Sequence, residues 1–222
     1  MVEYNPTFTD EFLQYYKKLE EVQSKYPVLY EKYKQSNYKK IESFRSFRNL
    51  LAHNESSLNY PAIVSNSFLQ EIKDVVSKLT TKSFDVCTKK SDLCVAELDD
   101  EMDKVIRVMN KHNFSRIPIL DNKGAVRYII TEKAILAILA ESSSASFGKG
   151  SLVKDYLPYF EINRNPKEKF IFVGRNEPAY QVEQKLGHLT DQSKTSVAFV
   201  TESGDKNEAI LGLITASNLL NF

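Results

Sequence analysis

Apolar residues in the first 82 positions recur every three or four residues, the spacing of helices that bury one face. Pro27 separates the first two helices, because proline breaks a helix interior but suits a first turn. A third helix is expected from about Tyr38 to His53, and a fourth is capped by Ser65 or Ser67. The apolar stripes comprise Phe12, Tyr16, Leu19, Val22, Ile41, Phe44, Phe47, Leu50, Leu51, Leu69, Ile72, Val76 and Leu79. The pattern therefore predicts an all-helical domain over residues 1–82.

From residue 83 onward, helical spacing gives way to short apolar runs joined by turns. The stretch Phe114–Leu139 indicates a strand, a tight turn at Asp121–Gly124, a return strand and an apolar helix. The glycine of this turn is free to take positive φ where the chain reverses. Alanine, isoleucine and leucine fill the helix at 134–140, so we expect other elements to cover it on several sides.

This unit is repeated. The same order recurs in Lys194–Leu220, and both return strands end in an Ile-Thr pair, at Thr131 and at Thr215. A short strand precedes each unit, at Leu93–Leu98 and at Phe170–Val173, and apolar residues at helical spacing follow it. An internal repeat is a better guide to the fold than any single motif. The predicted fold class is α+β, with an all-helical N-terminal domain followed by two β-α-β-β-α repeats.

Four short motifs give these repeats a resemblance to the CBS domain family, whose members commonly occur as a tandem pair. In the first copy, DVCTKK (Asp85–Lys90) matches the family's entry segment and SRIPILD (Ser115–Asp121) matches its first hairpin strand. In the second copy, LVKDYL (Leu152–Leu157) matches the entry and LGLIT (Leu211–Thr215) matches the return strand.

The resemblance covers residues 83–222. We refer to 83–143, the first CBS copy, as the first repeat and to 150–222, the second CBS copy, as the second repeat. The polar, Ser- and Gly-rich stretch Glu141–Ser151 links them. The resemblance implies a pseudo-twofold unit with a ligand cleft between the copies.

The family also implies that an adenine nucleotide, AMP-, ADP- or ATP-like, binds this cleft as a regulatory ligand, with no other cofactor required. Family members hold the ribose with a Thr or Ser on the return strand and an Asp three residues later. Thr131 and Thr215 match the first of these positions, whereas Ala134 and Asn218 stand at the second. Arg116 matches an Arg that contacts phosphate. One cleft is therefore expected to be altered or empty, and helix N-capping remains the alternative role of both threonines.

The sharpest chemical signal is FRSFRNLLAHN (Phe44–Asn54), at the end of the third expected helix. Four-residue spacing puts Asn49 and His53 on one face, and the long Arg48 side chain reaches beside them. Arginine offers planar donors to phosphate oxygens, and histidine exchanges a proton near neutral pH. The helix macrodipole also favours cations at a C-terminus, so a structural role for Arg48 and His53 is an open alternative.

The order Arg-Asn, three variable residues, then His resembles the hallmark of the HEPN family of small helical domains. Many members resemble metal-independent endoribonucleases that form their site across a dimer. The resemblance implies that Arg48 binds the scissile phosphate and that His53 transfers a proton at the ribose 2′-hydroxyl, while Asn49 orients both. It also implies RNA as a substrate and a homodimer as the assembly.

The composition of the chain argues against several classes of binding partner and site. A net charge of +1 over 222 residues gives no global basis for binding DNA or a membrane surface. Cys87 and Cys94 make neither a disulfide framework nor a metal site. No apolar run is long enough to span a membrane, and the N-terminus lacks the pattern of a signal peptide, so we expect a cytoplasmic protein. Motifs of kinases, serine hydrolases and metalloenzymes are absent from the sequence.

These observations favour a regulatory protein in which a CBS pair senses an adenine nucleotide or a related ligand and a HEPN-like domain acts as the output. Two roles are open for the helical domain. It is either a metal-independent endoribonuclease or a non-catalytic dimerisation or partner-binding element. A third interpretation is a structural module whose clefts no longer bind ligand.

Overall fold

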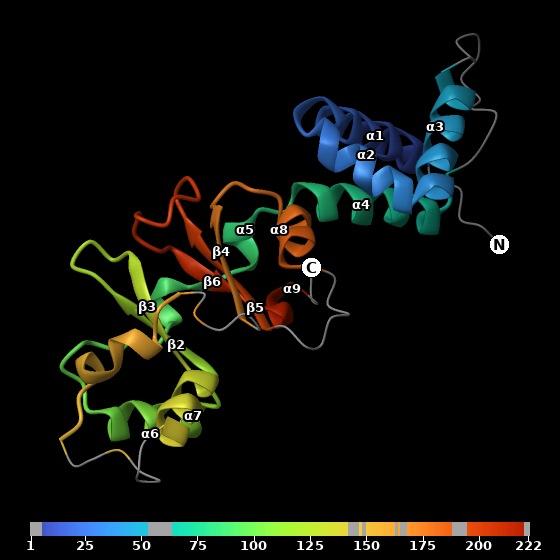
Figure 1. Cartoon of the computed structure of the whole chain (residues 1–222). Coiled ribbons are helices and arrows are strands. Elements are labelled where there is room, and N and C mark those ends of the chain that lie inside the picture. Colours follow the sequence, from blue (N-terminus) through green and yellow to red (C-terminus); the bar gives the residue numbers. More distant parts are fainter. Residues whose placement is uncertain are drawn as a thin grey trace. The chain divides into compact units, whose positions relative to one another are not determined.

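The computed structural model describes residues 6–52, 64–141, 147, 150–162, 164, 168–187 and 195–219. The chain forms two compact units (Figure 1), which we call unit 1 and unit 2. Unit 1 comprises Met1–Thr81 together with Pro178–Gln181, and unit 2 comprises Lys82–Glu177 and Val182–Phe222.

Unit 1 contains the helices α1 (Pro6–Lys25), α2 (Pro27–Ser36), α3 (Tyr38–Ala52) and α4 (Asn66–Thr80). Pro27 is the first residue of α2, where its missing N–H costs no helical hydrogen bond. Ser65, rather than Ser67, caps α4, because its hydroxyl accepts a hydrogen bond from the Phe68 N–H at 3.2 Å.

Aromatic rings fill the core of unit 1. Phe12 and Phe44 are fully buried, and their ring centroids lie 6.3 Å apart. The Phe12 ring also lies 5.4 Å from Phe47 and 5.5 Å from Phe68, so one α1 side chain joins α3 to α4. Tyr180 belongs to this core as well, although it lies in the second repeat.

The first repeat carries α5 (Ser83–Val86), β1 (Thr88–Lys89), η1 (Lys90–Asp92), α6 (Met102–His112), β2 (Arg116–Leu120), β3 (Val126–Thr131) and α7 (Glu132–Glu141). The second repeat carries η2 (Val153–Tyr159), β4 (Glu168–Gly174), α8 (Ala179–Leu186), β5 (Thr195–Thr201), β6 (Gly212–Ile214) and α9 (Ala216–Leu219).

The predicted hairpin of the first repeat is confirmed. β2 and β3 pair antiparallel, with Arg116 opposite Thr131. The Gly124 N–H donates to the Asp121 carbonyl at 2.8 Å, and Gly124 has a φ of 83°, a conformation that glycine adopts without strain.

One sequence-based expectation for the first repeat is wrong, because Leu93–Leu98 does not form a strand. Within this segment only Ala96 pairs, through one parallel bridge to Ile119. In α7, Ile138 is buried and Ala134, Ile135, Ala137 and Leu139 are half-buried. The exposed positions Glu132, Leu136 and Ala140 form one stripe, so the helix is covered on its other sides.

The two repeats exchange their entry segments within unit 2. β1 follows the DVC entry of the first repeat, yet it pairs antiparallel with β6 of the second repeat, with Thr88 opposite Leu213. The resulting sheet has the order β1-β6-β5-β4, and β4 runs parallel to β5. Reciprocally, Glu161 of the second repeat forms an antiparallel bridge with Tyr128 of β3. Each return strand therefore pairs with residues of the other repeat.

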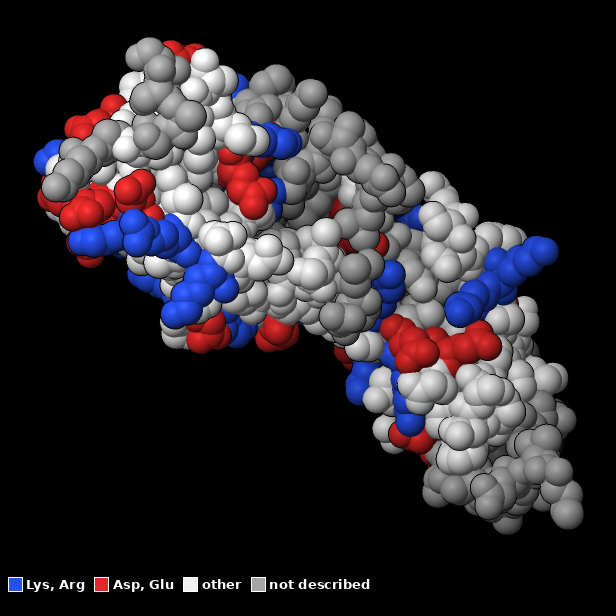
Figure 2. Space-filling model, turned by 90° about the horizontal axis from the view of Figure 1, so that it is seen from below, with Lys and Arg blue, Asp and Glu red and all other residues white. Residues whose placement is uncertain are grey.

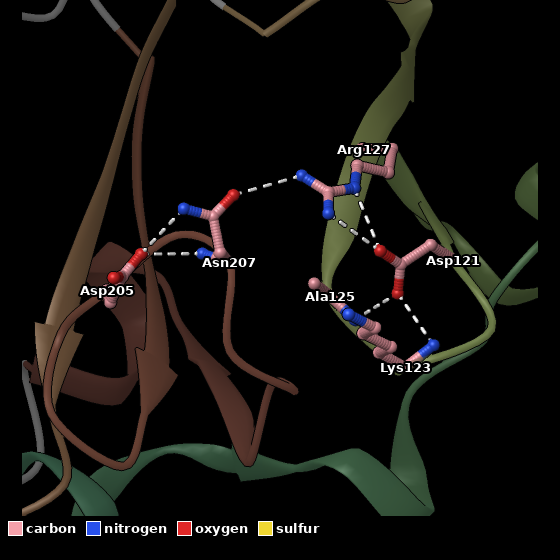
Figure 3. A network of polar contacts seen from close by, with 6 residues as sticks. All are labelled: Asp121, Lys123, Ala125, Arg127, Asp205 and Asn207. Carbon is pink, nitrogen blue, oxygen red and sulfur yellow. Dashed lines mark hydrogen bonds and ion pairs between the residues drawn. The ribbon is translucent and has the colours of Figure 1, made fainter.

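A polar network joins the hairpin turn of the first repeat to the β5–β6 connection (Figure 3). Asp121 accepts hydrogen bonds from the N–H groups of Ala125 and Lys123, each at 2.9 Å, and pairs with Arg127. These donors lower the pKa of the Asp121 carboxyl, with the Ala125 N–H as the largest cause. Arg127 also donates to Asn207 at 3.2 Å, so the two turns are linked through one guanidinium group.

Candidate functional site

Thr131 is the last residue of β3 and the N-cap of α7. Its hydroxyl accepts a hydrogen bond from the Ala134 N–H at 3.1 Å, which confirms the capping role. The same hydroxyl lies 3.3 Å from a Glu168 carboxylate oxygen, to which it donates. A threonine hydroxyl can do both, because it offers one proton and two acceptor lone pairs.

Glu168 begins β4 and is only 8% exposed, which is unusual for a carboxylate. The negative charge of Glu168 acts on Arg116, the residue that stands opposite Thr131 in the hairpin. Burial lowers the pKa of Arg116, while Glu168 and then Glu132 raise it. The Arg116 Nε atom is buried and lacks a hydrogen-bond partner in the described part of the chain. The fold thus gathers Arg116, Thr131 and Glu168 at one place.

A cavity of about 250 Å³ lies beside this cluster, and we call it the Thr131 cavity. Its described lining consists of Ile129, Thr131, Lys133, Ala134, Ala137, Glu141, Tyr159, Glu161, Arg164, Glu168 and Phe170. Residues of both repeats line it, as the exchange of entry segments requires. The described lining mixes apolar side chains with polar and charged ones, and convergent polar groups fix the orientation of a bound small molecule.

Arg164 and Tyr159, two residues of the lining, contact each other and also make hydrogen bonds. The Arg164 guanidinium lies over the Tyr159 ring, 4.4 Å from its centroid, and donates to the Pro158 carbonyl. The Tyr159 hydroxyl donates to Glu141. These contacts fix Tyr159 at the wall of the cavity.

Thr215 and Asn218 form a separate polar cluster. The Asn218 side-chain oxygen accepts hydrogen bonds from the Thr215 N–H and hydroxyl, both at 2.8 Å. The Asn218 amide donates to the Thr88 hydroxyl at 3.3 Å. Thr88 belongs to the entry of the first repeat, so the exchange builds this cluster too.

The structure describes two residues of the Arg-Asn-His motif. Arg48 donates to the Asn49 side-chain oxygen at 3.4 Å, and its guanidinium lies 5.9 Å from the centroid of the Tyr16 ring. Asn49 is exposed. His53 lies outside the described residues, so the structure places Arg48 and Asn49 side by side without testing the third member.

Sequence reasoning missed Glu168 as a site residue. Alternation along β4 carries the available signal, because Glu168 stands two positions before Phe170 and so shares its buried face. A charged residue at the start of a strand is otherwise most simply read as exposed.

Among the described residues, no helix has the length and apolar content needed to cross a membrane. The described side chains also include no group of His, Cys, Asp and Glu arranged to hold a metal ion.

Comparison with known proteins gives a family match for one segment of the chain. The CBS domain model matches residues 84–141. Inosine-5′-monophosphate dehydrogenase of Bacillus subtilis (strain 168) is 25% identical over 103 residues, which cover 46% of this chain and 20% of that enzyme. The match thus spans about one-fifth of the length of this relative.

Solved structures of similar fold include CBSX2 in complex with AMP, at 15% identity and a TM-score of 0.44, covering 63% of this chain and 92% of that one. The CBS domain pair of protein MJ0100, in complex with 5′-methylthioadenosine and S-adenosyl-L-methionine, has 20% identity and a TM-score of 0.43, covering 64% and 94%.

Proposed function

Because residues 84–141 form a CBS domain, we propose that this chain is a regulatory protein that binds an adenine nucleotide or a related adenosine compound. The proposed site is the Thr131 cavity. The observation that carries the proposal is the pairing of the Thr131 hydroxyl with the Glu168 carboxylate in a cavity lined by apolar and charged side chains. A ribose offers two neighbouring hydroxyls as donors to such a carboxylate, and Ile129 and Phe170 supply apolar surface for a base.

Calorimetric titration tests this site. AMP, ATP and S-adenosylmethionine are suitable probes, together with adenosine. We expect Thr131→Val to weaken binding about tenfold, because a lost hydrogen bond of about 1–1.5 kcal/mol corresponds to that factor. Valine keeps the β-branched shape and removes only the hydroxyl.

Thr215→Val is the matched control, since it removes the equivalent hydroxyl of the second repeat from a cluster that is separate from the cavity. Circular dichroism of both variants checks that they fold, because Thr131 also caps α7. Equal affinities of the two variants would place the ligand elsewhere. The absence of binding by every probe would leave a structural module as the better account.

For unit 1 we propose an output role with a metal-independent endoribonuclease site at Arg48, Asn49 and His53, shared across a homodimer. The adjacency of Arg48 and Asn49 at the end of α3 supports this role. RNA cleavage by the purified protein in excess EDTA tests it. We expect His53→Ala to abolish cleavage and the control His112→Ala to retain it.

A non-catalytic role for unit 1 is the second candidate, and the pairing of charges favours it. Lys40 lies 3.6 Å from Glu71, and both Lys34 and Arg45 pair with Glu42. Figure 2 shows Lys and Arg beside Asp and Glu on the described part of one face, with neither sign covering a wide area. Absence of cleavage by both wild type and His53→Ala would support this second candidate, a dimerisation or partner-binding element, whereas equal cleavage by both would exclude His53 from the cleavage site.

A further inference from the structure

We infer that the Thr131 cavity selects a nucleoside without phosphate, uncharged or cationic, over the corresponding nucleotide. This inference rests on the proposed function, because it assumes that the cavity takes an adenosine compound. It concerns the chemical class of that ligand. The charges and the volume of the cavity are the two observations from which we infer this class.

In the described part of the lining, carboxylates outnumber cations. Its acidic residues are Glu141, Glu161 and Glu168, and its basic residues are Lys133 and Arg164. Three negative and two positive side chains give these described residues a net charge of −1. A phosphate carries about two negative charges near neutral pH, so it meets like charge in this cavity.

Two guanidinium groups, those of Arg164 and Arg116, lie near the cavity. Arg164 is held against the Tyr159 ring and the Pro158 carbonyl. Arg116 stands outside the described lining, its guanidinium donates to the Ser115 hydroxyl at 3.0 Å, and the nearby charge of Glu132 balances its own, so adding Arg116 and Glu132 leaves the net charge unchanged. Among the described lining residues, Lys133 is the second cation, and it shares the lining with three carboxylates.

Glu168 is the residue that links ligand choice to the ribose. It is buried, it accepts a hydrogen bond from Thr131, and it shares the cavity lining with Ala134, which has no polar side chain. Ribose hydroxyls donate hydrogen bonds to a carboxylate, whereas phosphate oxygens repel it. Binding of the sugar at Glu168 therefore brings a 5′-phosphate close to a fixed negative charge.

Size points the same way. The cavity of about 250 Å³ is smaller than the roughly 300–1,000 Å³ of pockets that enclose drug-sized ligands. A nucleoside needs less room than a nucleoside triphosphate, and a methylthio or sulfonium substituent at the 5′ position adds no negative charge.

The test compares adenosine, 5′-methylthioadenosine, AMP and ATP by calorimetric titration of the full chain at low salt. We expect adenosine and 5′-methylthioadenosine to bind about tenfold or more tightly than AMP, with ATP weakest. Raising the salt concentration should narrow this gap, because salt screens the repulsion. AMP or ATP binding as tightly as adenosine overturns the inference and leaves the proposed function standing, whereas no binding by any compound overturns both.

Glu168→Gln tests the residue assignment. The glutamine keeps a hydrogen-bonding oxygen for Thr131 and removes the negative charge, so the preference for adenosine over AMP should shrink severalfold. Glu202→Gln is the control, because it removes an equal charge from an exposed residue that lies outside the lining. An unchanged preference in Glu168→Gln, with a melting temperature close to wild type, contradicts the assignment.

Discussion

Replacing Gly212 by alanine is expected to destabilise unit 2 by about 3 kcal/mol, at the upper end of the usual cost of overpacking. A Cβ atom at this position would lie 2.4 Å from the Cys87 sulfur and 2.5 Å from the Thr88 carbonyl oxygen. The second contact involves backbone, which cannot rotate away. The strand β1 would therefore move off β6, and the exchange of entry segments would be disturbed. Urea unfolding followed by circular dichroism measures the loss.

Two further variants make this prediction specific. Gly174→Ala should cost less, because its Cβ would approach the Ser203 carbonyl oxygen only to 3.1 Å. Adding Cys87→Ala to Gly212→Ala removes the sulfur contact but not the Thr88 contact, so we expect partial rescue. A Gly212→Ala protein as stable as wild type would mean that β1 does not pair closely with β6.

Phe12→Ala is expected to destabilise unit 1 by about 3–5 kcal/mol, the range for truncating a buried aromatic residue. Phe12 is fully buried and its ring contacts Phe44, Phe47 and Phe68. Removing it leaves a cavity where α1, α3 and α4 meet, and these partners also lose ring–ring contacts of about 0.5–1.5 kcal/mol each. Thermal unfolding with a probe of helix content measures the change.

Val28→Ala is the control for this second variant. Val28 is 83% exposed, so its truncation should change the free energy of unfolding by no more than about 0.5 kcal/mol. A Phe12→Ala loss as small as that of Val28→Ala would contradict the aromatic core of unit 1.

Local signals in the sequence predicted the helices and the hairpin well. Proline at position 27, the serine cap of α4 and the glycine turn at 121–124 each follow from local backbone chemistry, and the structure contains all three. The exchange between β1 and β6 was not predictable in this way, because it pairs residues more than 100 positions apart. Strand partners at such separation depend on packing of the whole unit rather than on local preference.

In the candidate site too, some residues were predictable from local sequence and others were not. Arg116 and Thr131 were predicted from motif positions, and the hairpin register brings them together. Glu168 comes from a strand start that carries no motif. Alternation along β4 indicates its burial, and its contact with Thr131 identifies it as a site residue. The contact between Arg48 and Asn49 follows from their neighbouring positions in α3. The role of His53 is a proposal that the cleavage assay tests.

A crystal structure of the chain grown with adenosine tests the central claim most directly. The account predicts electron density for the nucleoside in the Thr131 cavity, with the ribose hydroxyls within hydrogen-bond distance of the Glu168 carboxylate and the base against Phe170. Density for the nucleoside beside Thr215 and Asn218 instead, or an unchanged Thr131 cavity at saturating adenosine, would contradict it.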